Sequence, residues 1–235
     1  MDRLILWDVD GTLLTTDGIA AKAMQAAMLQ VVGPSAPMQR TGYAGKTDWL
    51  IIRESFPSLG SDGVAERLHE FIAAYSAGLE RQRTALSARS RVFAGVSVLL
   101  EALQATVRQA PLTGNIAAAA RIKLECTGLL HLLDIEAGAY GDDHYDRAAL
   151  VPIAAGRAAG RYGRSFNGPQ IVIVGDTPND IACGKANGAR TVAVATGPYS
   201  LAELAAYGPD AVLPDLSDTD AALAAIMGRE WNCRL

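Results

Sequence analysis

The feature that most limits the fold of this chain is a repeated pattern of short apolar runs that each end in polar turn residues. Runs rich in β-branched residues and apolar throughout are typical of strands buried on both faces, as in a parallel sheet. Stretches with helical spacing separate them, which predicts an α/β fold with an open, doubly wound, mostly parallel sheet and right-handed crossovers. The expected strands lie within 4–12, 105–115, 170–180, 191–198 and 211–216.

The helices expected between these strands carry recognisable end signals at 96–105, 116–130, 147–163 and 179–188. Asn115 is a good N-cap for the second of them. Pro152 must lie in the first turn of the third helix or kink it, and Gly188 is a plausible C′ glycine for the fourth. Pro111 predicts that its strand is irregular or lies at an edge of the sheet.

One long segment, 15–90, has helical spacing throughout and no convincing strand. We therefore expect an all-helical insertion after the first strand. The predicted domains are an α/β core formed by 1–14 and 91–235 and a helical cap formed by 15–90. The expected cap helices are 20–33, 47–56 and 64–86.

Composition excludes several classes of function. The chain has 21 basic and 25 acidic side chains and a net charge of -4, so nucleic acid is not an expected partner. No uncharged apolar run approaches the roughly 18 residues of a membrane span, so no membrane partner is expected either. The opening MDRLILWD does not resemble a signal peptide. We expect a cytoplasmic protein that is a monomer or a homodimer.

Acidic residues end two of the expected strands. Asp8 and Asp10 follow the first apolar run, and Asp176 and Asp180 follow the run at 171–175. In open α/β folds the functional crevice lies beyond the carboxyl ends of the strands, so these side chains should converge there. Several carboxylates at one edge repel one another unless a cation neutralises them, and a hard ion such as Mg²⁺ suits such ligands.

The expected strand at 105–115 ends in Thr113-Gly114-Asn115, which offers a hydroxyl and backbone N–H groups at a helix start. Such a helix start readily binds a phosphate oxygen. Each signal alone is ordinary turn chemistry. Together, a metal site and an anion site indicate phosphate-ester chemistry, in which a carboxylate can act as nucleophile and form an aspartyl-phosphate.

The segments DVDGTLL, LTGN and IVGDTPND resemble motifs I, II and IV of the haloacid dehalogenase (HAD) superfamily, in order and over nearly the whole chain. The helical insertion is similar to the C1 cap of the phosphoglycolate phosphatase-like and β-phosphoglucomutase-like branch. Gly45 to Asp48, GKTD, resembles a stretch found in such caps. The resemblance implies a HAD-like Rossmannoid core with an all-helical C1 cap.

The resemblance also implies roles for the acids. Asp8 would be the nucleophile and a Mg²⁺ ligand. Asp10 would be the general acid and base, and its backbone carbonyl would bind the metal. Asp176 would complete the metal ligands of the protein, and Asp180 would hold a metal-bound water or order the loop.

The remaining implied site residues bind phosphate. Thr113, with the backbone around Gly114 and Asn115, would bind the phosphoryl group. The lysine of a KPxP-like motif III is absent, and Arg147 matches its position best. An arginine is permanently charged and suits an electrostatic clamp. Lys123 and Arg157 are the weaker alternatives for this role.

The implied function is a Mg²⁺-dependent phosphatase for a small phosphorylated metabolite, similar to phosphoglycolate phosphatase. Lys46 in the cap could contact the substrate. A sugar-phosphate mutase, a phosphonatase using Lys46, and a 2-haloacid dehalogenase share this fold and remain alternatives, although Asp10 disfavours the last. A non-catalytic binding module is the least favoured, because Asp8, Asp10, Thr113 and Asp176 form a complete set.

Overall fold

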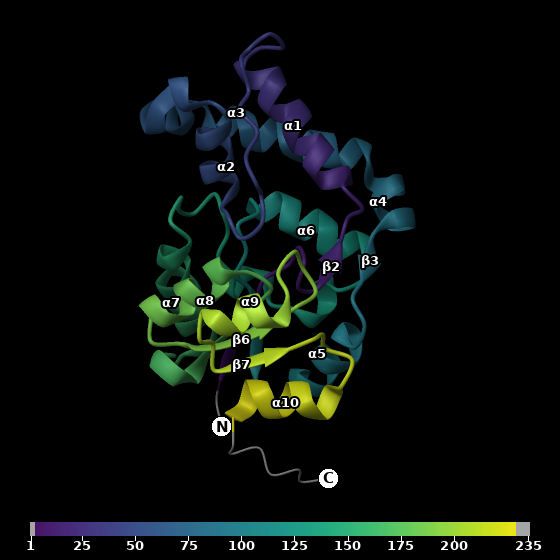
Figure 1. Ribbon diagram of the computed structural model, residues 1–235, viewed down its shortest axis with the longest axis vertical. Coiled ribbons are helices and arrows are strands. Elements are labelled where there is room, and N and C mark those ends of the chain that lie inside the picture. The colour runs from purple at the N-terminus through teal and green to yellow at the C-terminus, as the bar shows by residue number, and fades with distance from the viewer. Residues whose placement is uncertain (1–2, 229–235) are drawn as a thin grey trace.

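The computed structural model describes residues 3–228 and contains a five-stranded sheet below a group of helices (Figure 1). The strands follow the order β4-β1-β5-β6-β7, and every neighbouring pair is parallel. This confirms the predicted α/β class with a parallel sheet. The strands are β1 (Leu4–Trp7), β4 (Arg108–Pro111), β5 (Ile171–Gly175), β6 (Arg190–Val194) and β7 (Ala211–Leu213).

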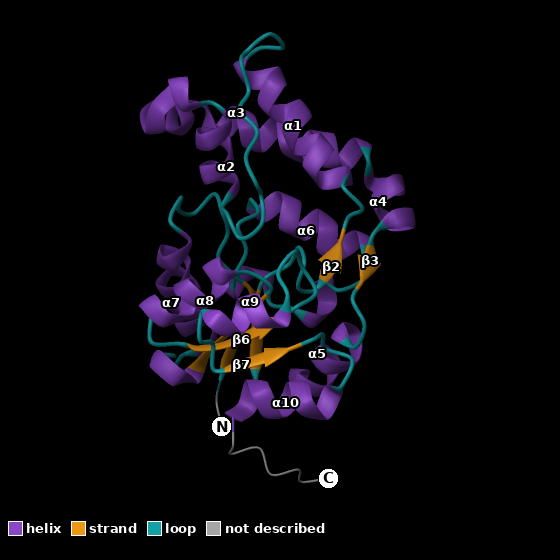
Figure 2. Ribbon diagram, in the orientation of Figure 1, coloured by secondary structure: helices purple, strands orange, loops and turns teal. Residues whose placement is uncertain are grey.

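Helices cover both faces of the sheet (Figure 2). The longer ones of the core are α5 (Val96–Gln104), α6 (Ala117–Cys126), α7 (Leu150–Tyr162), α8 (Pro178–Ala186), α9 (Leu201–Ala206) and α10 (Thr219–Met227). Short 3₁₀ turns connect some of them, namely η2 (Leu130–Leu132), η3 (Ile135–Ala137), η4 (Arg147–Ala149) and η5 (Gly168–Gln170).

Strand β1 lies inside the sheet, and its four residues are completely buried. Side chains alternate between the two faces of a strand. Ile5 and Trp7 pack in the cluster that contains α5 and α10, and Leu4 and Leu6 pack in the cluster that contains α7. The apolar run before Asp8 is therefore continuous because both faces of β1 are covered.

Several predicted end signals are confirmed. Pro152 lies in the first turn of α7, and Gly188, with φ 63°, follows the end of α8. Pro111 belongs to β4, which forms one edge of the sheet.

The prediction that Asn115 caps a helix is wrong. Helix α6 begins at Ala117, and its N-cap residue is Ile116, whose apolar side chain makes no capping hydrogen bond. The Asn115 side chain instead donates to Asp10 and Thr113. A favourable local propensity is thus overridden by other hydrogen bonds of this side chain, one of which joins residues 105 positions apart.

Residues 19–89, which lie between β1 and β4 in the chain, form the helical unit above the sheet in Figure 1. Its elements are α1 (Ile19–Val32), α2 (Asp48–Ser55), η1 (Pro57–Leu59), α3 (Gly60–Arg81) and α4 (Arg83–Arg89). The single helix expected over 64–86 is two helices that meet at Gln82. A short antiparallel ribbon of β2 (Leu14–Thr15) and β3 (Arg91–Val92) joins the two connections to the core.

The helical unit has its own apolar core, which extends onto the core domain. Ile116, Ala119 and Ile122, at the start of α6 and within it, belong to the same buried cluster as α1 and α3. Helix α6 accordingly lies between the cap and the sheet in Figure 1. Within residues 3–228, no helix combines the length and apolar character needed to cross a membrane.

We predict that Leu6→Ala lowers the free energy of unfolding by about 2–5 kcal/mol, because it leaves a cavity in a close-packed interior. Val98→Ala, at a side chain that is 59% exposed, should change it by less than about 0.5 kcal/mol. Urea denaturation of both variants measures the difference. Equal losses would contradict the central position of β1.

Candidate active site

Asp8 follows directly after β1 and is the first acid of the site. Its side chain is buried, and its Oδ1 accepts a hydrogen bond of 2.9 Å from Nη2 of Arg147. Arg147 lies in η4, just before α7, and also donates to Asp180 and to the carbonyl of Leu112. One buried guanidinium therefore holds two carboxylates from different parts of the chain.

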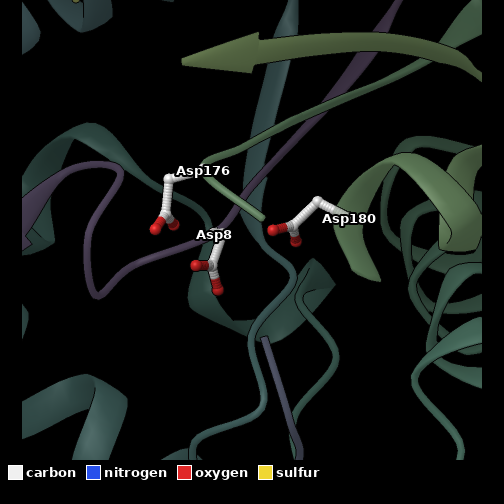
Figure 3. A group of neighbouring side chains, drawn as sticks. All are labelled: Asp8, Asp176 and Asp180. Carbon is white, nitrogen blue, oxygen red and sulfur yellow. The ribbon is translucent and has the colours of Figure 1, made fainter. Parts of the chain in front are cut away.

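Asp8, Asp176 and Asp180 form a buried carboxylate cluster, in which one oxygen of each lies within 4.8 Å of the others. Figure 3 shows the three side chains gathered around a common space. Adjacent strands bring them together, because β1 and β5 pair in parallel with Trp7 opposite Val174. Asp176 then follows the end of β5, as Asp8 follows the end of β1.

Burial and mutual repulsion shift the acid–base behaviour of this cluster. Burial raises the pKa of Asp176 to about 9, and the charges of Asp8 and Asp180 add to the rise. Burial also raises the pKa of Asp8 to about 6, against the opposing effect of Arg147. These acids are under-neutralised by the protein alone. Closely spaced carboxylates of this kind fit a hard divalent cation such as Mg²⁺.

The oxygens of Asp180 are already engaged by the protein. Oδ1 accepts from Arg147, and Oδ2 accepts from the N–H and the hydroxyl of Thr177 in the capping box of α8. Asp176 is less constrained, with one hydrogen bond of 3.0 Å from Thr12 to its Oδ1. Asp8 and Asp176 therefore have the freer oxygens, and Asp180 orients the cluster.

Gly11 allows the chain to pass close to Asp176. Its φ is 87°, a left-handed conformation that favours glycine, and an added Cβ would lie 2.4 Å from Oδ2 of Asp176. Gly11 therefore permits both the turn after β1 and the close packing of the Asp176 carboxylate.

Asp10 contacts a different set of residues. Its Oδ2 accepts from Nζ of Lys123 at 2.5 Å and from Nδ2 of Asn115 at 2.7 Å. Its side chain remains 40% exposed, whereas that of Lys123 is 3% exposed. The carboxyl group of Asp10 is thus separate from the cluster of Asp8, Asp176 and Asp180. Asp8, Asp10 and Asp176 nevertheless line one cavity.

The structure places the three candidate cations differently. Arg147 contacts the predicted nucleophile Asp8, and Lys123 contacts Asp10. Arg157 forms an ion pair with Asp143 instead, so the structure does not bring this alternative to the carboxylates. The sequence signal for Lys123 was weak, because one lysine on a helix is usually exposed; α6 is close enough to the site to bury it.

Thr113 lies just beyond β4 and is buried. Its hydroxyl oxygen accepts a hydrogen bond of 2.8 Å from the Asn115 side chain. Gly114 lies where the cap meets the core, since an added Cβ would be 1.9 Å from the carbonyl oxygen of Lys46. These residues and Asn115 line the same cavity as Asp8 and Asp10.

The backbone N–H groups at the start of α6 already have acceptors in this structure. Asp48 Oδ2 accepts from Ile116 N–H at 2.8 Å, and Asp142 Oδ1 accepts from Ala117 N–H at 2.9 Å. These two N–H groups are therefore not free to bind a phosphate oxygen in this structure. The expected phosphate site is limited to Thr113 and the backbone around Gly114. No local sequence signal indicates that Asp48 accepts a hydrogen bond at this helix start, because Asp48 and Ile116 are 68 positions apart.

Asp48 belongs to the cap, so its contact fastens the cap to the core. Its own N–H donates to the carbonyl of Gly114 at 2.7 Å. The Thr47 hydroxyl donates to the carbonyl of Tyr145, and Asn179 donates to the carbonyl of Gly45. The GKTD segment is therefore docked over the segment that follows β4.

Lys46 lines the cavity, but its ammonium group has partners within the cap. Nζ lies 2.5 Å from Oε2 of Glu54 and donates to the Thr41 hydroxyl at 2.9 Å. The structure thus places the Lys46 ammonium beside an acid of α2 and not on a core carboxylate.

A cavity of about 280 Å³ lies between cap and core. Its core side carries Asp8, Asp10, Thr113 and Asp176. Its cap side comes from α1, the loop before α2, α2 and α3. This volume is at the small end of the range for ligand pockets, so the site accommodates a small molecule.

Comparison with known proteins gives one partial family match. A family model described as HAD-hydrolase-like matches residues 148–219, a stretch that contains Asp176 and Asp180. A search of curated proteins finds no significant match.

Solved structures resemble the chain over almost its whole length. A predicted phosphoglycolate phosphatase from Haemophilus somnus has a TM-score of 0.65 at 19% identity, covering 94% of this chain and 97% of its own. A predicted phosphatase from Clostridium acetobutylicum has a TM-score of 0.66 at 16% identity, covering 94% and 98%. A HAD family hydrolase from Deinococcus radiodurans, with bound phosphate and sodium, has a TM-score of 0.56 at 21% identity, covering 96% of both.

The chain is therefore HAD-like. It has the fold of HAD hydrolases with a helical C1-type cap, and residues 148–219 carry the sequence signature of the family.

We predict that Asp48 makes stability depend on pH. Burial raises its pKa from 3.8 to about 7, so its contribution is complete below pH 3.8 and is lost as the pH rises through about 7. Asp48→Asn keeps an acceptor for Ile116 but cannot ionise. The free energy of unfolding of Asp48→Asn minus that of the unsubstituted chain should increase from about pH 5 to about pH 8. Urea denaturation at each pH measures this difference.

Asp17→Asn is the matched control for this prediction. Asp17 is exposed and its pKa is lowered by a hydrogen bond from Arg89, so it is ionised throughout that range in both states. A difference for Asp48→Asn that stays constant with pH would contradict the assignment.

We also predict that Mg²⁺ stabilises the chain through the carboxylate cluster. Mg²⁺ at about 100 times its dissociation constant contributes about 2.7 kcal/mol, which should raise the Tm of the native chain by roughly 5 °C or more. Asp176→Asn should lose most of this shift. Asp142→Asn, outside the cluster, should keep it, and an equal shift in both variants would contradict a metal site at Asp176.

Proposed function

We propose that this protein is a Mg²⁺-dependent phosphatase that hydrolyses a small phosphorylated metabolite through an aspartyl-phosphate intermediate. One observation carries the proposal. The buried carboxylate of Asp8 is held by Arg147 on one oxygen, beside Asp176, at the floor of a small cavity that a cap covers. The HAD-like fold supports it, and the Haemophilus somnus and Clostridium acetobutylicum structures are described as predicted phosphatases.

Asp8 is the proposed nucleophile. Arg147 fixes Oδ1, and Asp8 lines the cavity in which the phosphorus atom of a substrate would lie. A bond forms from an Asp8 oxygen to phosphorus while the bond from phosphorus to the substrate alcohol breaks. Burial raises the pKa of Asp8, and the Arg147 guanidinium opposes that rise and so favours the ionised form that attack requires.

Asp10 is the proposed general acid and base. Its exposed carboxyl group lines the cavity and is held by Lys123 and Asn115. Asp10 would give a proton to the departing alcohol and then take one from the water that hydrolyses the aspartyl-phosphate. Lys123 and Asn115 act as positioning residues, because they contact Asp10 and hold its orientation.

The remaining groups would balance the charge of the phosphoryl group. Asp8 and Asp176, with the Asp10 backbone carbonyl, are the proposed ligands of Mg²⁺, and Asp180 supports them. When bound, the ion supplies positive charge to the phosphate oxygens. Arg147 adds a fixed positive charge at the nucleophile.

The phosphate end of the substrate would rest on the segment after β4. The Thr113 hydroxyl is the proposed side-chain donor, with the backbone at Gly114 and the Asn115 amide beside it. The docked cap would exclude bulk water during transfer and must open for product release. Lys46 is the proposed cap contact for the rest of the substrate.

We predict that Asp8→Asn lowers kcat at least about 1,000-fold, because removal of a nucleophile eliminates the covalent path. Hydrolysis of a panel of small phosphate monoesters, with and without Mg²⁺, measures this effect. Acid quenching of the native chain should trap a phosphoryl group on the peptide that contains Asp8, which mass spectrometry detects.

Asp62→Asn is the control, since Asp62 is an exposed residue in the first turn of α3. It should retain activity within about twofold. Full activity of Asp8→Asn would contradict the enzymatic proposal, and activity that is indifferent to divalent metal would contradict the Mg²⁺ part of it.

A further inference from the structure

The cap side of the cavity differs in chemistry from the core side. Apolar side chains from α1 and α2 supply much of it, together with two tyrosines and one lysine. Burial raises the pKa of both tyrosines, so their hydroxyls stay neutral at physiological pH. The residues concerned are Ala20, Ala21, Met24, Tyr43, Lys46, Ile51 and Tyr75.

Lys46 is the single cation on this cap side among residues 3–228, and an acid neutralises it. Its ammonium lies 2.5 Å from Glu54, and the Thr41 hydroxyl donates to the same carboxylate. The two charged side chains are 25% and 36% exposed, so the pair is not sealed from water. Lys46 lines the cavity, and Glu54 lies outside its lining, beside a neighbouring hollow of the cap. The pair offers polar contacts but no net charge.

The cations on the core side are also paired. Arg147 contacts Asp8 and Asp180, and Lys123 contacts Asp10. No cation that lines the cavity within the described part of the chain lacks a carboxylate partner. A substrate with a second anionic group, besides its phosphate, would therefore meet no unbalanced positive charge.

Asp48 adds to this bias, because it is a further buried acid that lines the cavity at the cap side. A carboxylate on the substrate would lose its hydration on entering and would meet acids on both sides. Desolvating a charge without a compensating partner is unfavourable. An uncharged alcohol incurs no such cost and gains contact with the apolar wall.

We propose that this cavity selects small phosphate monoesters whose alcohol portion is uncharged, and that the Lys46–Glu54 pair discriminates against carboxylated esters such as phosphoglycolate. This inference rests on the proposed phosphatase function and specifies its substrate class. Met24 and Ile51 contact the alcohol portion, Lys46 meets its hydroxyl groups, and Glu54 balances the charge of Lys46 from outside the cavity.

Two esters of similar size test the proposal. 2-Hydroxyethyl phosphate and 2-phosphoglycolate differ chiefly in the charge of the alcohol portion. With Mg²⁺ present, we expect kcat/KM for the hydroxyethyl ester to exceed that for phosphoglycolate by at least about tenfold, because like-charge juxtaposition is costly. Equal values, or a preference for phosphoglycolate, would overturn the inference while leaving the phosphatase function intact.

Glu54→Gln tests the role of the pair itself. Removing the acid leaves the Lys46 charge unbalanced, so the ratio of kcat/KM values should shift toward phosphoglycolate by about two- to fivefold, as expected for a partly exposed ion pair. Glu80→Gln is the matched control, because it makes the same change in the exposed Glu80–Arg83 pair of the cap. An equal shift in both variants, or none in Glu54→Gln, would overturn the assignment to this pair.

Binding separates failure of this inference from failure of the proposed function. Calorimetry of Asp8→Asn with Mg²⁺ and each ester measures the same preference without turnover. Tighter binding of 2-hydroxyethyl phosphate supports the inference, even if the native chain hydrolyses neither ester. Equal or tighter binding of phosphoglycolate overturns it. A native chain that binds both esters in the expected order but hydrolyses no phosphate ester contradicts only the phosphatase proposal.

Discussion

The contact of Arg147 with Asp8 and Asp180 is the interaction on which the rest of the site depends. Buried carboxylates so close together repel one another, and removing one partner from a buried ion pair typically costs about 3–5 kcal/mol. Arg147 offsets part of this repulsion and fixes the direction of Asp8. It leaves Asp176 under-neutralised, with its pKa raised to about 9. That remaining imbalance is what makes the cluster suitable for a divalent cation.

The segment from Thr113 into helix α6 connects the carboxylate cluster to the cap. Thr113 and Asn115 lie between the carboxylates and helix α6. The carboxylate of Asp48, in the cap, accepts a hydrogen bond from Ile116 N–H at the start of that helix. The cap also shares its apolar core with α6 through Ile116 and its neighbours. Cap docking and the order of the proposed phosphate-binding segment are thus physically linked, because the Asp48 carboxylate contributes to both.

Much of this could be predicted from the sequence. The β1 and β5 runs are recognisable because strands buried on both faces are apolar at every position, and their terminal acids follow at the sheet edge. Asn115 was assigned as a helix cap because its local propensity is favourable, but Asp10 and Thr113 compete for its side chain. Lys123 has the local sequence of an exposed helical residue, and only the position of α6 buries it.

The sequence by itself determined the fold class and the helical insertion, and it predicted that Asp8, Asp176 and Asp180 converge. Periodicity and motifs are properties of neighbouring residues along the chain, which is why they can be read without a structure. Only the tertiary structure decided which charge meets which. Arg147 and Asp8 are 139 positions apart, and Asp10 and Lys123 are 113 apart. The pairing of Lys46 with Glu54 likewise depends on how a loop folds against α2. Electrostatic balance depends on distances of a few ångströms between side chains, and no local pattern specifies those distances.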